Sequence, residues 1–321
     1  MYSNAAAVSR PELTTYLEEA PDLEKGLIAK EVLPIYTSSE RAGRYPRIKS
    51  GNGGLLDIVT GDRRAPSGSY NRTDRKWDWD TFDTEDRGSE EAIPDVLVKE
   101  MDKFFDMEKI TSKLVARANL FTYEKDVADL VMSPANSGFT STNSGTAYTE
   151  ANIATFDFVA DIQDAHARLE AKGYSANTLV LSRTLWNRIS RSTKLQTFMF
   201  GHLSNTGNAN ITLPALADKL MIDKILISGR SYNAAKKGQS QSLTALWGNA
   251  YALLINTQSG DFSNGGAGRT IVWGADSPGG LFTTETYREE NVRGDVVRVR
   301  SNRALKVVDS AAAELLATQY A

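Results

Sequence analysis

The chain of 321 residues has no cysteine and only two histidines, His166 and His202. The missing thiols exclude disulfide bonds, a cysteine nucleophile and thiolate metal sites together. Two histidines without an HExxH motif are too few for a histidine-based metal site. We interpret His166 as a packed structural residue, because it lies beside the apolar positions Val159, Ile162 and Leu169. The sequence therefore predicts no catalytic residue, no metal site and no cofactor.

Motifs for nucleotide binding and ester hydrolysis are missing as well. No stretch matches GxxxxGK[ST] or GxSxG, and glycines 265–268 lack the spacing of a dinucleotide-binding turn. The acidic stretch 78–86 does not fit a calcium-binding EF-hand loop, because Asp83 and Ser89 stand where Gly and Glu are needed. A site made of carboxylates leaves no local pattern, so a carboxylate-based hydrolase stays open as an alternative.

The sequence also lacks long apolar runs and an excess of basic residues. No apolar stretch approaches the roughly 20 residues of a membrane-spanning helix, and the N-terminus does not resemble a signal peptide. We therefore expect a protein made in the cytosol, without membrane contact. The net charge is −3, whereas a protein that holds nucleic acid tightly presents a basic surface.

The tripeptide Arg293-Gly294-Asp295 matches an integrin-binding motif. A secreted adhesin is therefore a further alternative, although the missing signal peptide weighs against it. We interpret the tripeptide as a turn in which Gly294 provides a positive φ angle.

The first forty residues contain short amphipathic pieces that Pro11, Pro21 and Pro34 interrupt. We interpret residues 1–40 as an arm that packs on a neighbouring copy of the chain rather than as part of the core. A frayed terminus is the alternative.

Residues 41–92 predict an extended hairpin. Trp77-Asp78-Trp79-Asp80 alternates apolar and charged side chains, which is typical of a half-exposed strand. The segment has too few apolar residues for a core of its own, yet it carries two of the five tryptophans. Packing on another copy explains both facts, with Arg63 and Arg64 as a basic patch for acidic residues of a neighbour. The candidates for contacts between subunits are therefore Arg63, Arg64, Trp77, Asp78, Trp79 and Asp80.

A long helix is predicted next. Pro94 suits a first helical position, and residues 95–133 contain neither Gly nor Pro. Apolar residues recur at helical spacing, first around Leu97 and Met101 and then in the stripe Ile110, Leu114, Val115 and Ala118. An unbroken helix would be roughly 50–60 Å long. The helix therefore either spans the molecule or breaks near residues 120–122.

The second half of the chain alternates helices and strands. After a polar connector at 134–154, Thr155 is predicted to cap a helix, and residues 177–182 read as a buried strand. Ser182 is predicted to cap the next helix. Further strands are expected at 225–228, 243–247, 250–255 and beyond residue 283. This alternation predicts an α/β or α+β domain.

The order of these elements resembles the major capsid protein of tailed bacteriophages, which has the Hong Kong phage capsid fold. Residues 77–82 with Ile93-Pro94-Asp95 resemble the family's passage from an extended loop into a spine helix, and residues 121–128 resemble the end of that helix. The strand 177–182 followed by Leu185-Trp186, and residues 220–227 with 245–248, resemble the family's axial domain. The resemblance covers nearly the whole chain.

The resemblance implies an α+β capsid fold with four parts. These are an N-terminal arm at 1–40, an extended loop at 41–92, a peripheral domain at 93–154 and 281–321, and an axial domain at 155–280. The extended loop would lie across the adjacent subunit. Some members cross-link a loop lysine to a neighbour, but Lys49 and Lys76 stand in no matching motif.

The implied function is a structural protein without enzymatic activity. It would self-assemble into hexamers and pentamers that form the icosahedral head around phage double-stranded DNA, without binding a particular DNA sequence. The implied partners are a separate scaffolding protein, a portal and decoration proteins. The protein would reside in the virion capsid and assemble in the host cytoplasm. The nearest alternative is the shell of a bacterial nanocompartment, which shares this fold and encloses an enzyme.

Overall fold

The computed structural model describes most of the chain. The described residues are 8–10, 13, 25–48, 58, 62–64, 66–72, 77–101, 106–201, 211–236, 238–260, 262, 265–277 and 280–320. Helices and strands are mixed along this chain and form two main sheets, which confirms the predicted α+β class. Within these ranges, no helix combines the length and the apolar character that crossing a bilayer requires.

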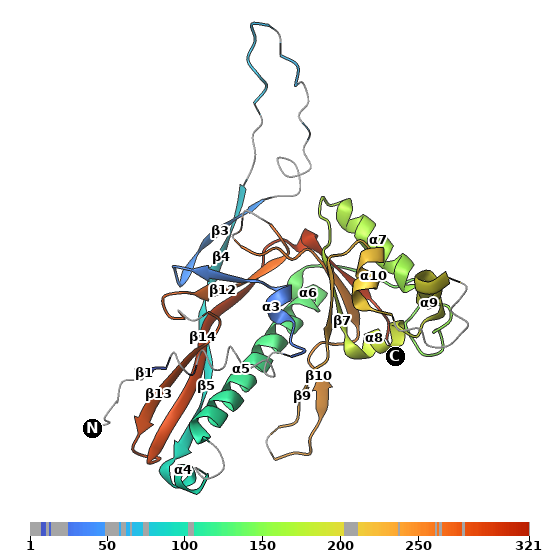
Figure 1. Cartoon of the computed structure of the whole chain (residues 1–321). Helices are drawn as coiled ribbons and strands as arrows, with labels where there is room; N and C mark the ends of the chain where they lie inside the picture. The colour runs from blue at the N-terminus through green and yellow to red at the C-terminus, as the bar shows by residue number, and fades with distance from the viewer. Residues whose placement is uncertain are drawn as a thin grey trace.

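A six-stranded sheet and a long helix form one half of the molecule (Figure 1). The fourteen-residue strand β14 is central and pairs with β13 on one edge and with β5 on the other. The strands of this sheet are β1 (Val8–Ser9), β2 (Ile35–Ser38), β5 (Glu85–Pro94), β12 (Gly268–Trp273), β13 (Thr283–Glu289) and β14 (Gly294–Val307). Helix α5 (Met107–Val131) runs along this sheet.

The predicted long helix is interrupted earlier than expected. A short helix α4 (Asp95–Met101) directly follows β5, so Pro94 ends a strand and does not begin the helix. Asp106 caps α5, because its side chain accepts a hydrogen bond from the Lys109 N–H at 3.3 Å. From there α5 continues through residues 120–122, so of the two alternatives the break at that place is wrong.

The buried face of α5 also differs from the predicted stripe. Val115 is buried as expected, but Ile110, Leu114 and Ala118 are exposed. The buried face instead includes polar residues, which are Thr111, Ser112, Asn119 and Glu124. A hydrophobic pattern could not identify this face, because polar side chains there form hydrogen bonds inside the protein.

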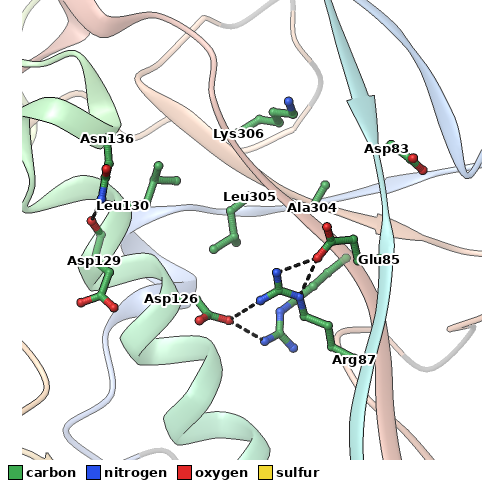
Figure 2. A pocket seen from close by; sticks show the side chains of 11 residues that line it. Asp83, Glu85, Arg87, Asp126, Asp129, Leu130, Asn136, Ala304, Leu305 and Lys306 are labelled. Carbon is green, nitrogen blue, oxygen red and sulfur yellow. Dashed lines mark hydrogen bonds and ion pairs between the residues drawn. The ribbon is translucent and has the colours of Figure 1, made fainter.

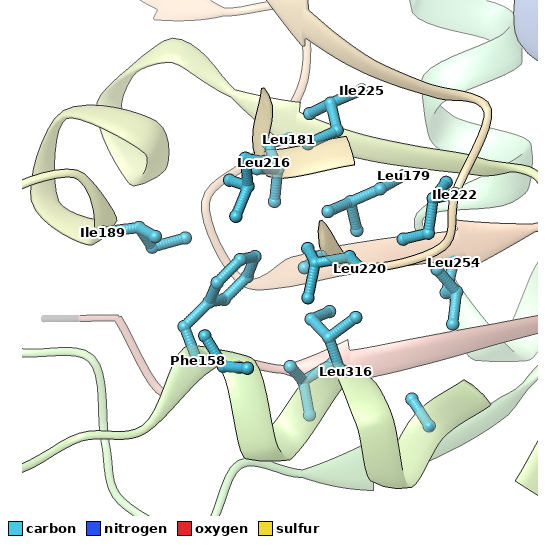
Figure 3. Packing of buried hydrophobic residues seen from close by; sticks show 14 of the residues in the cluster. Phe158, Leu179, Leu181, Ile189, Leu216, Leu220, Ile222, Ile225, Leu254 and Leu316 are labelled. Atoms are coloured by element: carbon cyan, nitrogen blue, oxygen red, sulfur yellow. The ribbon is translucent and has the colours of Figure 1, made fainter. Parts of the chain in front are cut away.

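A five-stranded sheet forms the other half, in the order β6-β15-β11-β7-β8. Its strands are β6 (Thr140–Asn143), β7 (Thr178–Ser182), β8 (Lys224–Ser228), β11 (Tyr251–Ile255) and β15 (Ala313–Ala317). Helices cover one face, and Figure 3 shows Leu179, Leu254 and Leu316 of the sheet in one cluster with Phe158 and Leu220. These helices are α7 (Phe158–Glu170), α8 (Arg183–Ile189), α9 (Thr193–Phe200) and α10 (Leu213–Lys219).

The other face of this sheet packs against α5. Val180 and Leu253 from the sheet join Val127 and Val131 of the helix in one buried cluster. The two halves of the molecule therefore share a core. The short helix α6 (Pro134–Ser137) follows α5, and the 3-10 helix η3 (Ser310–Ala312) precedes β15.

The predicted helix caps are partly right. Ser182 caps α8, and its hydroxyl accepts a hydrogen bond from the Leu185 N–H at 3.2 Å. The cap of α7 is Asp157 rather than Thr155, whose hydroxyl donates to the Asn152 carbonyl instead.

Three strands pair in a different sheet from the other strands of the domain to which the sequence assigns them. Residues 140–143 and 313–317 belong to the five-stranded sheet, although the boundaries assign them to the peripheral domain. Residues 268–273 pair with β14, although the boundaries assign them to the axial domain. Strand pairing joins segments that are distant in sequence, and local patterns do not reveal the partner.

The prediction of an arm outside the core is wrong for residues 28–38. Helix α3 (Ala29–Val32) packs on α5, and Ile28, Val32 and Leu33 are buried. Strand β2 pairs in parallel with β12. Most of residues 1–24 lie outside the described residues, where the prediction stays untested.

Two antiparallel strand pairs stand apart from both main sheets. Strand β3 (Ala42–Ile48) pairs with β4 (Trp77–Asp83), and β9 (Ser231–Asn233) pairs with β10 (Leu243–Ala245). In Figure 1, residues 62–72 extend beyond the β3–β4 pair, away from both halves of the molecule.

Candidate assembly surfaces

The β3–β4 pair has two faces of different character. Its register places Trp77 opposite Ile48, Trp79 opposite Pro46 and Asp80 opposite Tyr45. Side chains alternate along a strand, so the two tryptophans of β4 share one face, while its aspartates Asp78 and Asp80 share the other. The alternation predicted for residues 77–80 is confirmed. In most half-exposed strands the apolar side chains face the protein, but here the aspartates face it and the tryptophans face solvent.

The inner face attaches the hairpin to the rest of its own chain. Tyr45 and Phe82 are buried and pack with Ile271, Ala304 and Val308 of the six-stranded sheet and its continuation. This contact fixes which face of the hairpin can remain free.

The two aspartates of the inner face have partners in their own chain. Arg47 forms an ion pair with Asp78 at 3.1 Å, and the Tyr45 hydroxyl donates a hydrogen bond to Asp80 at 3.1 Å. Burial and the neighbouring Asp80 carboxylate raise the pKa of Tyr45 above its ordinary value, so the hydroxyl keeps its proton. Asp78 and Asp80 therefore already make contacts without a second subunit.

The outer face of the hairpin is aromatic and open to solvent. Trp77 is 56% exposed and Trp79 is 61% exposed. Isolated exposed apolar residues are common, but two large aromatic side chains on one face of a projecting hairpin mark an interaction surface. We call the side formed by Trp77, Trp79 and Thr81 the tryptophan face.

The extension beyond the hairpin carries Arg63 and Arg64. Every described side chain at 62–64 and 66–72 is exposed. The Arg64 guanidinium stacks over the Tyr70 ring at 5.1 Å and donates to the Pro66 carbonyl at 3.4 Å. The structure does not bring these arginines to Asp78 or Asp80 of the same hairpin.

A groove of about 420 Å³ lies where β4, β5, α5 and β14 meet (Figure 2). Asp126 of α5 accepts hydrogen bonds from Arg87 at 2.9 Å and from Arg303 at 3.2 Å. Arg87 also pairs with Glu85 at 2.6 Å. Burial lowers the pKa of Arg303, and the Asp126 carboxylate opposes that change. These pairs join β5, α5 and β14 in the half that contains the six-stranded sheet.

The groove does not have the layout of a carboxylate active site. Glu85 and Asp126 both accept hydrogen bonds from the Arg87 guanidinium group, which occupies their oxygens. The hydrogen bond from Arg87 also lowers the pKa of Glu85. Across the described part of the chain, no group of three His, Asp or Glu side chains is placed to hold a metal ion.

Sequence reasoning missed the buried carboxylate of Glu124, which is 1% exposed. It accepts hydrogen bonds from the Ile28 N–H at 2.8 Å, the Ala29 N–H at 2.9 Å and the Trp247 Nε1–H at 2.6 Å. Burial raises the pKa of Glu124, while these three donors oppose that shift. The sequence gave no local signal for it, because Lys125 and Asp126 follow directly and the partners of Glu124 are distant in the chain.

Two other interpretations from the sequence have different outcomes. His166 is largely buried, and its ring nitrogens lie 3.3 Å from the Ala176 carbonyl and 3.4 Å from Glu170, which agrees with a structural role. The reason given for Gly294 is wrong. The positive φ of 46° belongs to Arg293, and Gly294 is needed because a Cβ there would lie 2.2 Å from the Ile93 carbonyl oxygen.

The fold is shared with solved structures of phage origin. A phage-related protein from Bordetella bronchiseptica RB50 aligns over 98% of both chains with a TM-score of 0.71 and 17% identity. The capsid protein in the structure of cyanophage P-SCSP1u aligns with a TM-score of 0.56 and 15% identity, over 90% of this chain and 86% of that one. The chain has the phage capsid fold. The predicted α+β phage capsid fold is thereby confirmed.

A third structure with this fold is a virus-like particle from Pyrococcus furiosus. It aligns with a TM-score of 0.55 and 10% identity, over 95% of this chain and 98% of that one. No protein-family model and no curated protein matches the sequence. At these identities the likeness establishes the architecture, and function has to be argued from the surfaces.

Proposed function

We propose that this chain is the major capsid protein of a tailed bacteriophage, which self-assembles into hexamers and pentamers. The closed icosahedral shell would enclose double-stranded DNA. In this proposal the protein is structural rather than enzymatic, resides in the virion capsid and assembles in the host cytoplasm. A scaffolding protein, a portal and decoration proteins would act beside it.

The observation that carries the proposal is the exposed tryptophan face in a chain with a capsid fold. The inner face of the same hairpin is already packed, and no described residue of the chain covers Trp77 and Trp79, so a neighbouring molecule is the partner that we propose for them. Aromatic side chains bury large apolar areas and are enriched at protein interfaces. A neighbouring copy in a shell would supply the missing contact for every subunit.

Assembly of purified protein tests the proposal. Electron microscopy of the protein expressed alone and with the scaffolding gene should show closed shells. Trp77→Ser with Trp79→Ser should abolish them, whereas the control Thr81→Ala on the same face should keep them. Discrete small oligomers of the unaltered chain under all conditions, or shells from the double variant at wild-type yield, would refute the proposal.

A nanocompartment shell is the second candidate, because the virus-like particle from Pyrococcus furiosus shares the fold. Mass spectrometry of particles from the native host separates the two. Packaged DNA with a portal supports the phage head, and an enclosed enzyme supports the compartment.

A further inference from the structure

The solvent side of α5 carries a row of apolar residues. Ile110 is 37% exposed and Leu114 is 54% exposed, and Phe121, further along the helix, is partly exposed. These positions recur at helical spacing, so the three side chains lie along one side of the helix over roughly three turns. Lys113 and Arg117 lie beside them. We call these five residues the helix stripe.

The packing of α5 within its own chain does not explain why the helix stripe is apolar. A surface helix normally buries its apolar side and exposes its polar side. The buried side of α5 instead includes the polar residues Thr111, Ser112 and Asn119. Exposed aliphatic side chains do not stabilise the subunit, because their contact with water is unfavourable. A partner that covers the helix stripe would remove these side chains from water.

The charges along the helix stripe are all positive. Residues 109–122 contain three basic residues and no Asp or Glu, although the chain as a whole has a net charge of −3. Lys109 forms an ion pair with Asp106 at 3.3 Å. In the described part of the chain, no carboxylate pairs with Lys113 or Arg117, and the Arg117 guanidinium lies 5.2 Å from the centre of the aromatic ring of the stripe. The helix stripe is therefore an apolar row with a positive border.

We propose that the helix stripe binds an acidic amphipathic helix of another protein. Apolar residues at helical spacing pack against the apolar side of a second helix, as in other complexes that bind an amphipathic helix. Carboxylates beside the apolar side of that helix would pair with Lys113 and Arg117, and such charge complementarity selects one partner over others.

Other occupants fit the helix stripe less well. A nucleic acid would pair with the basic residues but would leave Ile110 and Leu114 in water. A second copy of the chain offers the acidic helix α7, whose apolar residues Phe158, Val159 and Ile162 are already buried in its own subunit. A separate protein with a free amphipathic helix is therefore the occupant that satisfies both the apolar row and the charges.

The identity of this partner rests on the proposed function, in which a scaffolding protein acts beside the capsid protein. A contact over roughly three turns of one helix is small, and small interfaces with exposed charges are typical of transient complexes. Such a contact suits a partner that is needed only while the shell is being built.

Fluorescence anisotropy with two labelled peptides tests the proposal. Both peptides are amphipathic helices with leucine on one side, and the other side carries glutamate in one peptide and lysine in the other. The unaltered subunit should bind the glutamate peptide at least about tenfold more tightly than the lysine peptide. Lys113→Glu with Arg117→Glu should reverse this preference. The control Arg72→Glu with Lys236→Glu, which changes two exposed basic residues elsewhere, should retain it. Leu114→Gln should weaken the binding of the glutamate peptide about tenfold.

If the charge-reversed subunit does not fold, Lys113→Gln with Arg117→Gln replaces it and should abolish the preference. Equal binding of the two peptides, or a preference that survives these variants, would overturn the proposal. Tighter binding of a DNA duplex than of the glutamate peptide would identify a nucleic-acid surface instead. A lower melting temperature of Leu114→Gln would show that the stripe is packed within its own chain.

Failure of the proposed function gives a different result. In that case the unaltered chain forms no shells, although the preference for the glutamate peptide remains. If only the present proposal fails, closed shells form and the preference is missing.

Discussion

Glu124 joins three segments of the chain that are far apart in sequence. Its carboxylate accepts hydrogen bonds from N–H groups at the start of α3 and from the Trp247 side chain, while its own backbone lies in α5. A buried carboxylate is costly unless its oxygens are satisfied, and here both are. We therefore expect this residue to hold the N-terminal segment and the region around residue 247 against the long helix.

Replacement of Glu124 by alanine should destabilise the subunit. Three buried N–H groups would lose their acceptor, and we expect the free energy of unfolding to fall by about 1–3 kcal/mol. Chemical unfolding of unassembled subunits measures this change. The control is Glu91→Ala on exposed β5, which should change the free energy of unfolding by less than about 0.5 kcal/mol.

The effect should depend on pH in a defined direction. Because burial raises the pKa of Glu124, the folded state holds this proton more tightly than the unfolded chain does. The stabilising contribution is complete below the ordinary glutamate pKa and is lost as the pH rises through the raised value. The difference in free energy of unfolding between the unaltered chain and Glu124→Ala should therefore become smaller from acidic towards neutral pH. A difference that becomes larger over this range would contradict the account.

At the scale of elements, the two faces of the β3–β4 hairpin have different roles. The inner face stabilises the folded subunit, and we propose that the outer face makes contacts between subunits. Phe82 on the inner face is 7% exposed, whereas Trp79 on the outer face is 61% exposed. Removal of a buried aromatic side chain leaves a cavity, but removal of an exposed one leaves the subunit nearly unchanged.

Two alanine variants should therefore behave in opposite ways. Phe82→Ala should lower the free energy of unfolding by about 3–5 kcal/mol. Trp79→Ala should change it by less than about 0.5 kcal/mol and should instead reduce assembly. Thermal unfolding of single subunits, together with light scattering during assembly, measures both quantities. Equal destabilisation by the two variants would show that the tryptophan face is packed within the subunit.

The sequence predicted helices and strands well where neighbouring residues alone determine the structure. The buried strand at 178–182 and its Ser182 cap follow from a continuous apolar run and a capping hydroxyl. The alternation at 77–80 was also right, but alternation does not tell which face is buried. That depends on Ile271 and Ala304, which lie far along the chain.

The long helix shows what local sequence patterns could not predict. Its break at Asp106 depends on a capping hydrogen bond, and its buried face contains Asn119 and Glu124, whose partners are distant in sequence. The sheet partners of β6, β12 and β15 are likewise distant in sequence. The arrangement in space of the predicted contact residues, with two aspartates inward and two tryptophans outward, required the structure.

For the whole molecule, one open aromatic surface projects from a continuous core. Both tryptophans of the tryptophan face are exposed, and the described part of their own chain does not cover them. The core that α5 forms with the five-stranded sheet is shared by both halves of the molecule. A subunit of this kind is suited to a closed shell, in which each copy makes the same contacts.

A density map of the assembled particle by cryo-electron microscopy tests this account most directly. We predict a closed icosahedral shell in which Trp77 and Trp79 of every subunit are buried against a neighbouring copy. A closed shell with both indole rings open to solvent would contradict the central claim, as would a protein that stays monomeric with and without its scaffolding partner.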